Sequence, residues 1–129
     1  MIDKQLRNYK DLIVWQKAMD LVSDVYRVTA NFPREEVYGL TNQLRRSAVS
    51  VPSNIAEGQG RAPKGEFIQF LCHSRGSLLE LETQVLIASS LGYWNTQQQQ
   101  VLQTNVTEVA RMLNGLLSSL GAFRRKPRD

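Results

Sequence analysis

Apolar side chains recur every three or four residues along most of the chain, which is the spacing of one face of an α-helix. The pattern predicts four helices, separated by short connections that contain glycine or proline. No stretch alternates with a period of two, so no strand is predicted. Short connections make neighbouring helices antiparallel, and the predicted fold is an all-α, up-down-up-down four-helix bundle. The helices are expected at about residues 11–31, 34–57, 64–91 and 95–121.

The first predicted helix carries two apolar stripes, whereas a helix in an isolated bundle needs only one. We expect one stripe to face the core and the other to lie on a flank that a lone bundle covers only partly, which is typical of an interface. The alternative is that one wide core buries both stripes. The inward stripe is predicted to be Trp15, Met19, Val22 and Tyr26, and the oligomer interface is predicted to be Val14, Leu21, Val25 and Val28.

Single residues mark the ends and irregularities of these helices. Asp11 is the predicted N-cap of the first helix. Pro52 lies inside the second helix, where proline removes a backbone hydrogen bond, so we expect a kink near residues 47–51 or a break into two pieces. Gly76 costs roughly 1 kcal/mol of helix propensity relative to alanine, and we expect another backbone to come close there.

Length and composition fit one domain. The chain has 129 residues, of which 42% are hydrophobic, and this is enough for one sizeable core. We expect the bundle domain to span residues 1–123 and a basic tail to span residues 124–129. The N-terminal residues lack the apolar run of a signal peptide, and no stretch approaches the roughly 20 apolar residues that cross a bilayer. A cytoplasmic protein without membrane contact is therefore expected.

The net charge of +4 is concentrated at the C-terminus. The tail carries four positive side chains and one negative side chain, so the rest of the chain is nearly neutral. A basic tail attracts polyphosphate, but a solvated terminus that only keeps the protein soluble explains the same residues. The basic residues of the tail are Arg124, Arg125, Lys126 and Arg128.

The residues needed for an active site are not evident. Cys72 is the one cysteine and His73 the one histidine, which excludes a multi-cysteine metal cage and a di-iron site with paired Glu-x-x-His motifs. Adjacent side chains on a helix point about 100° apart, so Cys72 and His73 do not face each other. We therefore expect no enzymatic activity, no metal and no cofactor, and we expect Cys72 to be a small apolar filler.

Four ordered blocks of sequence carry a resemblance to a known family. The most specific is AVSVPSNIAEG at residues 48–58, which continues into Gly60-Arg61. The others are DLIVWQKA at 11–18; FP, YGL and QLRR at 32–33, 38–40 and 43–46; and EF, FL, RGSLLELETQ and LGY at 66–67, 70–71, 75–84 and 91–93. Over roughly residues 7–120 the chain resembles the 23S ribosomal RNA intervening-sequence protein family, also called four-helix bundle proteins.

The resemblance implies fold and assembly more firmly than function, because function must be argued from a site. Members of the family are bacterial proteins, some of them encoded within insertions in 23S ribosomal RNA genes. They are similar in fold to the accessory protein of diversity-generating retroelements. The resemblance therefore implies a homo-oligomer, in the form of a ring-like homopentamer, without an established enzymatic activity or molecular function.

RNA or DNA is the ligand class that we predict for this oligomer, because arginine and lysine contact phosphates without reading sequence. Residues 39–65 carry four positive side chains and one negative side chain, and assembly would multiply this charge. Two alternatives stay open: the basic residues form ion pairs that set helix register, or the charge-poor fourth helix docks a protein partner and the molecule is a scaffold. The predicted phosphate-binding residues outside the tail are Arg45, Arg46, Arg61, Lys64 and Arg75.

Overall fold

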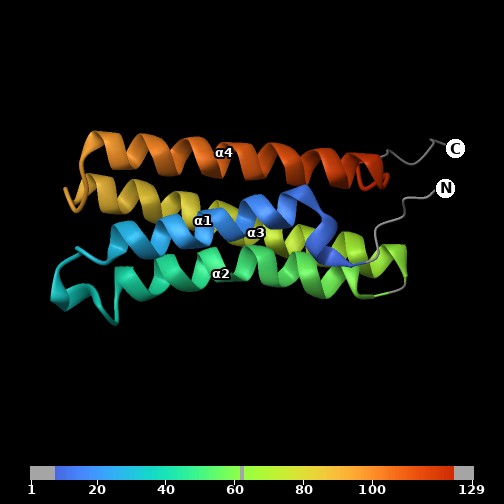
Figure 1. Cartoon of the computed structure of the whole chain (residues 1–129), viewed down its shortest axis with the longest axis horizontal. Coiled ribbons are helices and arrows are strands. Elements are labelled where there is room, and N and C mark those ends of the chain that lie inside the picture. Colours follow the sequence, from blue (N-terminus) through green and yellow to red (C-terminus); the bar gives the residue numbers. More distant parts are fainter. Residues whose placement is uncertain (1–7, 62, 124–129) are drawn as a thin grey trace, which may run out of the picture.

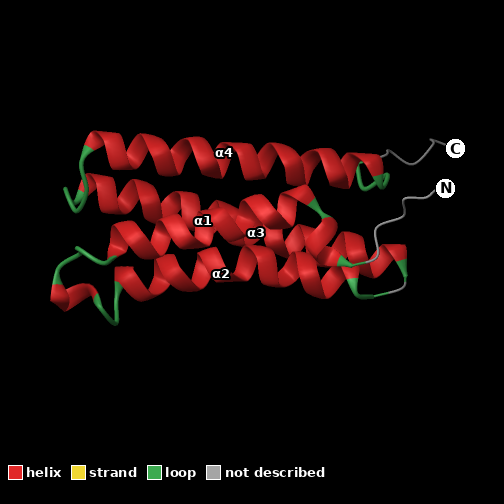
Figure 2. Ribbon diagram, in the orientation of Figure 1, coloured by secondary structure: helices red, strands yellow, loops and turns green. Residues whose placement is uncertain are grey.

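Four long helices make up the fold, and the predicted four-helix bundle is confirmed. The structure, a computed structural model, describes residues 8–61 and 63–123. Successive helices run in opposite directions and lie side by side (Figure 1), and the described residues contain no strand (Figure 2). The elements are α1 (Ile13–Thr29), α2 (Leu40–Gln59), α3 (Lys64–Ser90) and α4 (Thr96–Ser119), with the 3-10 turns η1 (Tyr9–Asp11) and η2 (Arg34–Glu36).

Each helix contributes an apolar stripe to a single core. α1 and α3 each pack against both α2 and α4, so the four helices enclose the core between them. Burying a valine or leucine side chain fully is worth about 1.5–3 kcal/mol, which is why stripes with this spacing drive the helices together. The fully buried residues include Leu44, Val51 and Ile55 on α2, Leu71, Leu81 and Val85 on α3, and Leu102, Leu113 and Leu117 on α4.

The two apolar stripes of α1 lie only partly where they were predicted: of the expected inward stripe, Trp15 and Val22 do pack against the core. The inward stripe was expected to include Met19 and Tyr26, but these residues keep exposed fractions of 42% and 43%. The stripe expected at an oligomer interface lies in the core of the single chain instead, so that assignment is wrong. Periodicity shows that α1 has two apolar faces, but not which face the neighbouring helices cover. The misassigned residues are Val14, Leu21 and Val25, which are buried, and Val28, which packs against the core.

Two helices begin later than their apolar patterns suggest. α1 begins at Ile13, because Asp11 belongs to the turn η1 and Leu12 directly precedes the helix, so Asp11 is not the N-cap. α2 begins at Leu40, because residues 34–36 form the turn η2 and the chain turns once more before the helix. Apolar spacing does not distinguish a 3-10 turn from the first turn of an α-helix.

Other helix ends agree with the sequence. At the start of α4, Asn95 Oδ1 accepts a hydrogen bond from the Gln98 amide at 2.8 Å, and the Asn95 amide donates to Gln98 Oε1 at 3.1 Å. This reciprocal pair is a capping box, which satisfies two amide groups that lack partners within the helix. α3 ends just before Gly92, whose φ of 73° requires glycine.

α2 passes through Pro52 without interruption. The predicted alternative of two helical pieces is therefore wrong, and the kink stays a prediction. Two polar side chains next to the proline donate to helix carbonyls one turn earlier: Ser53 Oγ to Val49 and Asn54 Nδ2 to Ser50, both at 2.8 Å. These bonds tie side chains to the turn that the proline leaves one backbone hydrogen bond short.

α2 and α3 approach each other closely at Gly58 rather than at Gly76. A Cβ atom added at Gly58 would lie 2.5 Å from the Cβ of Phe70 on α3, whereas one added at Gly76 would meet nothing within 4 Å. The expected helix crossing at Gly76 is therefore wrong. The absence of a side chain at Gly58 lets α2 and α3 meet at this end of the bundle.

In the part of the chain that the structure describes, the bundle has neither a cluster of metal ligands nor a membrane-spanning helix. Among the described residues, histidine, cysteine and acidic side chains do not gather in groups that could hold a metal ion. Within the same part of the chain, no helix combines the length and apolar character needed to cross a bilayer. Cys72 is exposed, so its expected role as a buried filler is wrong.

Candidate functional site

Polar side chains line the seam between α2 and α3. In one half of this seam they form hydrogen bonds between the two helices. Ser50 Oγ and Ser77 Oγ lie 2.7 Å apart, and Ser74 Oγ donates to the Val51 carbonyl at 2.8 Å. Ser74 is fully buried, so its hydroxyl needs this partner. We call these four residues, together with Gly58, the closed half of the seam; Ser50 lies at its border and also lines the depression described next.

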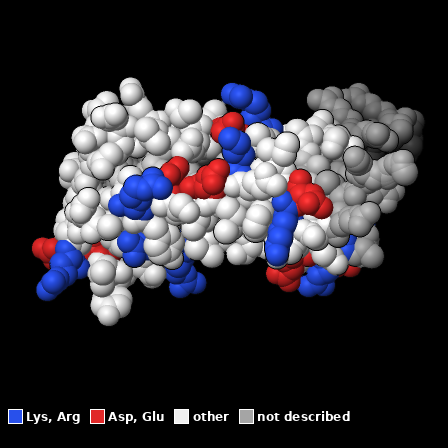
Figure 3. All heavy atoms as spheres, viewed as in Figure 1, with Lys and Arg blue, Asp and Glu red and all other residues white. Residues whose placement is uncertain are grey.

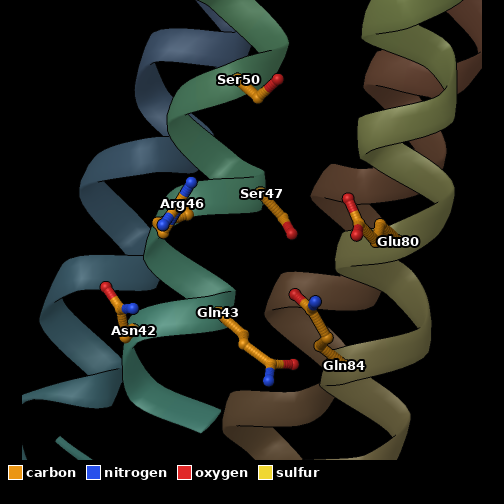
Figure 4. Close-up of a pocket in the computed structure, with 7 residues that line it drawn as sticks. All are labelled: Asn42, Gln43, Arg46, Ser47, Ser50, Glu80 and Gln84. Atoms are coloured by element: carbon orange, nitrogen blue, oxygen red, sulfur yellow. The ribbon is translucent and has the colours of Figure 1, made fainter. Parts of the chain in front are cut away.

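The other half of the seam opens into a polar depression of about 360 Å³. Figure 4 shows the side chains of Gln43, Ser47 and Gln84 directed into the gap between α2 and α3. Arg46 lies at the outer edge on α2, and Glu80 lies on the α3 side. The polar depression is defined by its lining residues: Asn42, Gln43, Arg46, Ser47, Ser50, Glu80 and Gln84.

Gln84 is a buried amide with an unused acceptor. Its exposed fraction is 7%, and its Oε1 atom accepts no hydrogen bond from the described residues. A buried carbonyl oxygen without a partner costs about 1–3 kcal/mol. Sequence reasoning did not single out Gln84 as a site residue, although a signal was present: the amide lies three residues after Leu81 and next to Val85, at the spacing of the core stripe.

The two charged groups of the polar depression are also unpaired. Arg46 and Glu80 line the same depression, yet neither forms an ion pair or a hydrogen bond with any described residue. A guanidinium carries five N–H donors and a carboxylate only acceptors, so both groups can bind a polar ligand. The depression therefore presents a cation, an anion and a buried carbonyl oxygen, all without protein partners among the described residues.

A second depression, of about 520 Å³, adjoins the first and lies between α2 and α1. Arg46 also lines this depression, so it occupies the ridge between the two. Tyr26 and Val49 line this depression and keep exposed fractions of 43% and 40%, and Met19, about two helical turns before Tyr26 on α1, keeps an exposed fraction of 42%. We call these three residues the α1–α2 apolar face. It includes part of the stripe of α1 that was expected to face the core.

Two of the predicted phosphate-binding residues are engaged in contacts within the chain. Arg45 Nε donates to Thr29 Oγ1 at 2.9 Å, and its guanidinium lies 4.5 Å from the centre of the Tyr26 ring. Arg61 pairs with Glu57 at 3.1 Å and with Glu66 at 3.5 Å. These contacts favour the alternative in which basic residues fix the packing of the helices.

The other predicted phosphate-binding residues of the bundle, Arg46, Lys64 and Arg75, do not form one continuous patch. The guanidinium of Arg75 lies 5.4 Å from the centre of the Phe123 ring. Arg46 lies roughly 20 Å along the bundle from the end of α2 that adjoins Lys64, since a helix rises about 1.5 Å per residue. Figure 3 shows basic and acidic side chains interspersed on one face of the bundle. The predicted tail residues Arg124, Arg125, Lys126 and Arg128 lie outside the described residues.

Glu36 fixes the start of α2, next to the polar depression. Its Oε1 accepts from the Leu40 amide at 2.9 Å, and its Oε2 accepts from the Tyr93 hydroxyl at 2.7 Å. The Leu40 bond, followed by the Tyr93 bond, holds the pKa of Glu36 below its ordinary value. The same hydrogen bond to Glu36 raises the pKa of Tyr93. Glu36 thus joins the beginning of α2 to the turn between α3 and α4.

Comparison with known proteins identifies the family. The model described as 23S rRNA-intervening sequence protein matches residues 10–115. The chain belongs to this family. The match includes α1 to α3 and most of α4, and therefore every residue of the polar depression of this intervening-sequence protein. A comparison with curated proteins gave no match.

A solved structure has the same fold as this intervening-sequence protein. It is a protein with unknown function from the S23 ribosomal protein family of Bacteroides thetaiotaomicron, with a TM-score of 0.74 and 19% sequence identity. The likeness covers 81% of this chain and 98% of the other. At this identity the likeness establishes the four-helix arrangement and carries no information about the ligand.

Proposed function

We propose that this family member is a non-catalytic, cytoplasmic binding protein that works as a homo-oligomer and takes RNA or DNA as its ligand. The observation that supports this function best is Arg46, an exposed cation on the ridge between two depressions, without an ion-pair partner among the described residues. A guanidinium in that state is available to bind a phosphate oxygen in bidentate fashion. Arg45 and Arg61, in contrast, are occupied by contacts within the chain.

Assembly is the second part of the proposal, because one Arg46 gives little affinity by itself. A ring of protomers presents the same arginine several times to one nucleic-acid strand, and linked sites bind far more tightly than single ones. The α1–α2 apolar face supports self-association, since exposed apolar side chains that lie close together commonly mark an interface. The proposed assembly is the homopentamer that the resemblance implies, with Met19, Tyr26 and Val49 replacing the core residues first expected at its interface.

A protein-binding scaffold is the alternative function, and the same apolar face favours it. An apolar contact with a different protein would bury Met19, Tyr26 and Val49, just as a contact with a second copy of this chain would. The two functions respond differently to salt. Nucleic-acid binding through phosphates weakens steeply as salt rises, whereas an apolar protein contact does not.

Binding titrations with labelled single-stranded RNA and DNA over a series of salt concentrations test the proposed ligand. We expect Arg46→Ala to lower affinity and to reduce the salt slope by about one unit for each protomer that contacts the strand. The matched control is Arg111→Ala, which removes an exposed arginine from α4, diagonally across the bundle. Affinity that is independent of salt, or equal losses for Arg46→Ala and Arg111→Ala, would contradict the proposal. Removal of residues 124–129 measures the contribution of the tail.

Light scattering tests the proposed assembly. We expect a mass well above the 14.7 kDa of one chain, and we expect Met19→Asp to reduce it, because a carboxylate in the α1–α2 apolar face resists burial. Leu79→Asp is the matched control, since Leu79 is an exposed apolar residue of α3 that lies outside this face. A wild-type protein with the mass of one chain would contradict the assembly.

A further inference from the structure

We propose that the polar depression between α2 and α3 is a pocket for one unpaired nucleobase, with guanine as the best-fitting base. This inference rests on the proposed nucleic-acid function and specifies which part of the ligand the site recognises. Three observations carry it: the Gln84 carbonyl oxygen, the Glu80 carboxylate and the Arg46 guanidinium line one depression, and none of them has a partner among the residues that the structure describes.

The unused acceptor of Gln84 points to a ligand with hydrogen-bond donors. Gln84 is more than nine-tenths buried, and Figure 4 shows its side chain directed into the depression. A hydrogen bond from a ligand would remove the cost of the unpaired carbonyl oxygen, so that cost becomes part of the binding free energy. A bound water would also satisfy one acceptor, but it would leave the charges of Arg46 and Glu80 unpaired.

The second acceptor narrows the ligand to a group with adjacent donors. Glu80 lies one helical turn before Gln84 on α3, so their side chains share one face of that helix. A carboxylate accepts hydrogen bonds and donates none. Two acceptors one turn apart therefore match a planar group that carries N–H donors on two neighbouring nitrogen atoms of one edge.

Guanine has that edge among the four bases of RNA. Its Watson–Crick edge places the N1–H and N2 amino donors side by side, next to the O6 acceptor, whereas adenine and cytosine each offer one amino group and uracil one imino group. Gln43 and Ser47 face Gln84 across the gap (Figure 4) and can donate to O6. Proteins read unpaired bases through such edges in single-stranded loops and ends of RNA.

Arg46 supplies the remaining contact, to the backbone of the strand. It lies at the outer edge of the depression, where the strand would leave the pocket, and its guanidinium suits a phosphate oxygen. The volume of about 360 Å³ lies at the lower end of the range for small-ligand sites and accommodates a single base. None of the seven described lining residues is aromatic, so recognition rests on hydrogen bonds to the base edge rather than on stacking.

Fluorescence anisotropy with the full chain tests this pocket. The probes are labelled oligouridines that carry one central guanosine, inosine or adenosine, and inosine differs from guanosine only by lacking the N2 amino group. We expect guanosine to bind at least about fivefold more tightly than inosine or adenosine. Glu80→Gln and Gln84→Met are expected to abolish that preference, and Gln97→Met, which makes the same substitution on the exposed surface of α4, is expected to retain it.

The outcomes separate this inference from the function on which it rests. Binding that depends on Arg46 but is equal for guanosine and inosine would overturn the base pocket and leave the nucleic-acid function intact. Absence of binding to every probe at low salt would overturn both. Because Glu80 is exposed, Glu80→Gln is expected to keep the fold, so a loss of preference in that variant reports recognition. Circular dichroism of each variant checks the fold.

Discussion

The two halves of the seam between α2 and α3 are built on the same pair of helices, but their polar groups do different things. In the closed half, the hydroxyls of Ser50, Ser74 and Ser77 all have partners, and Gly58 lets α2 approach α3 closely. In the polar depression, longer side chains occupy the facing positions, and the Gln84 carbonyl oxygen has no partner in the described part of the chain. Small residues thus close one half of the interface between α2 and α3, and longer polar residues leave the other half open.

The closed half should be the more sensitive to added volume. Gly58→Ala places a Cβ atom 2.5 Å from that of Phe70, and we expect a net loss of about 2 kcal/mol of stability despite the gain in helix propensity. The measurement is urea unfolding followed by circular dichroism at one fixed protein concentration. Gly76→Ala is the control: with nothing within 4 Å of the new atom, it should gain about 0.5–1 kcal/mol. Equal effects at both sites would show that α2 and α3 do not meet at Gly58.

Removing a hydroxyl should distinguish the two halves a second time. Ser74→Ala deletes the buried hydrogen bond to the Val51 carbonyl, and we expect a loss of about 1 kcal/mol of unfolding free energy. Ser47→Ala, on the facing helix in the polar depression, should cost less than about 0.5 kcal/mol, because no described residue bonds to its hydroxyl. Thermal unfolding of both variants provides the comparison. A larger loss for Ser47→Ala would place a structural contact in the depression.

Adjacent arginines on α2 should separate structural charge from charge available to a ligand. Arg45→Ala removes the bond to Thr29 Oγ1 and the contact with the Tyr26 ring, so we expect a loss of about 1 kcal/mol. Arg46→Ala should leave stability within about 0.5 kcal/mol of the wild type while lowering nucleic-acid affinity. We therefore expect Arg45→Ala to lower mainly the stability and Arg46→Ala to lower mainly the affinity for nucleic acid. A stability loss of the same size in Arg46→Ala would assign it a structural role.

The fold that contains these two halves of the seam was only partly predictable from the sequence. Apolar spacing predicted four antiparallel helices because burial of leucine and valine dominates helix association. It failed for the stripes of α1, since Val25 and Tyr26 are both compatible with a core and only the position of α2 decides between them. A close approach of two helices was also wrongly expected at Gly76, because helix propensity does not indicate which residues lie opposite a glycine.

The candidate site was predicted even less completely. Arg46 was predicted as a phosphate-binding residue and Glu80 lies within a matched block, but their position in one depression depends on the rotation of α2 against α3. Gln84 lies within the matched block 75–84, at the spacing of the apolar core positions. Its burial depends on how the helices pack and cannot be read from its neighbours in the chain. A polar amide within an apolar stripe is the sequence signal that could have indicated it.

The smallest expected effect concerns Glu36, whose two hydrogen bonds anchor the start of α2 beside the open half of the seam. Because the pKa of Glu36 is lowered in the folded protein, its contribution to stability is fully present above the ordinary glutamate pKa of about 4.3 and is lost as pH falls through the lowered value. We therefore expect Glu36→Gln to lower the melting temperature near neutral pH, and the difference from wild type to shrink in acid. Melting curves from neutral pH down to about pH 3 measure this, with Glu35→Gln as a control that removes the same charge without breaking either bond. A difference that persists unchanged in acid would show that the carboxylate charge of Glu36 does not account for the effect.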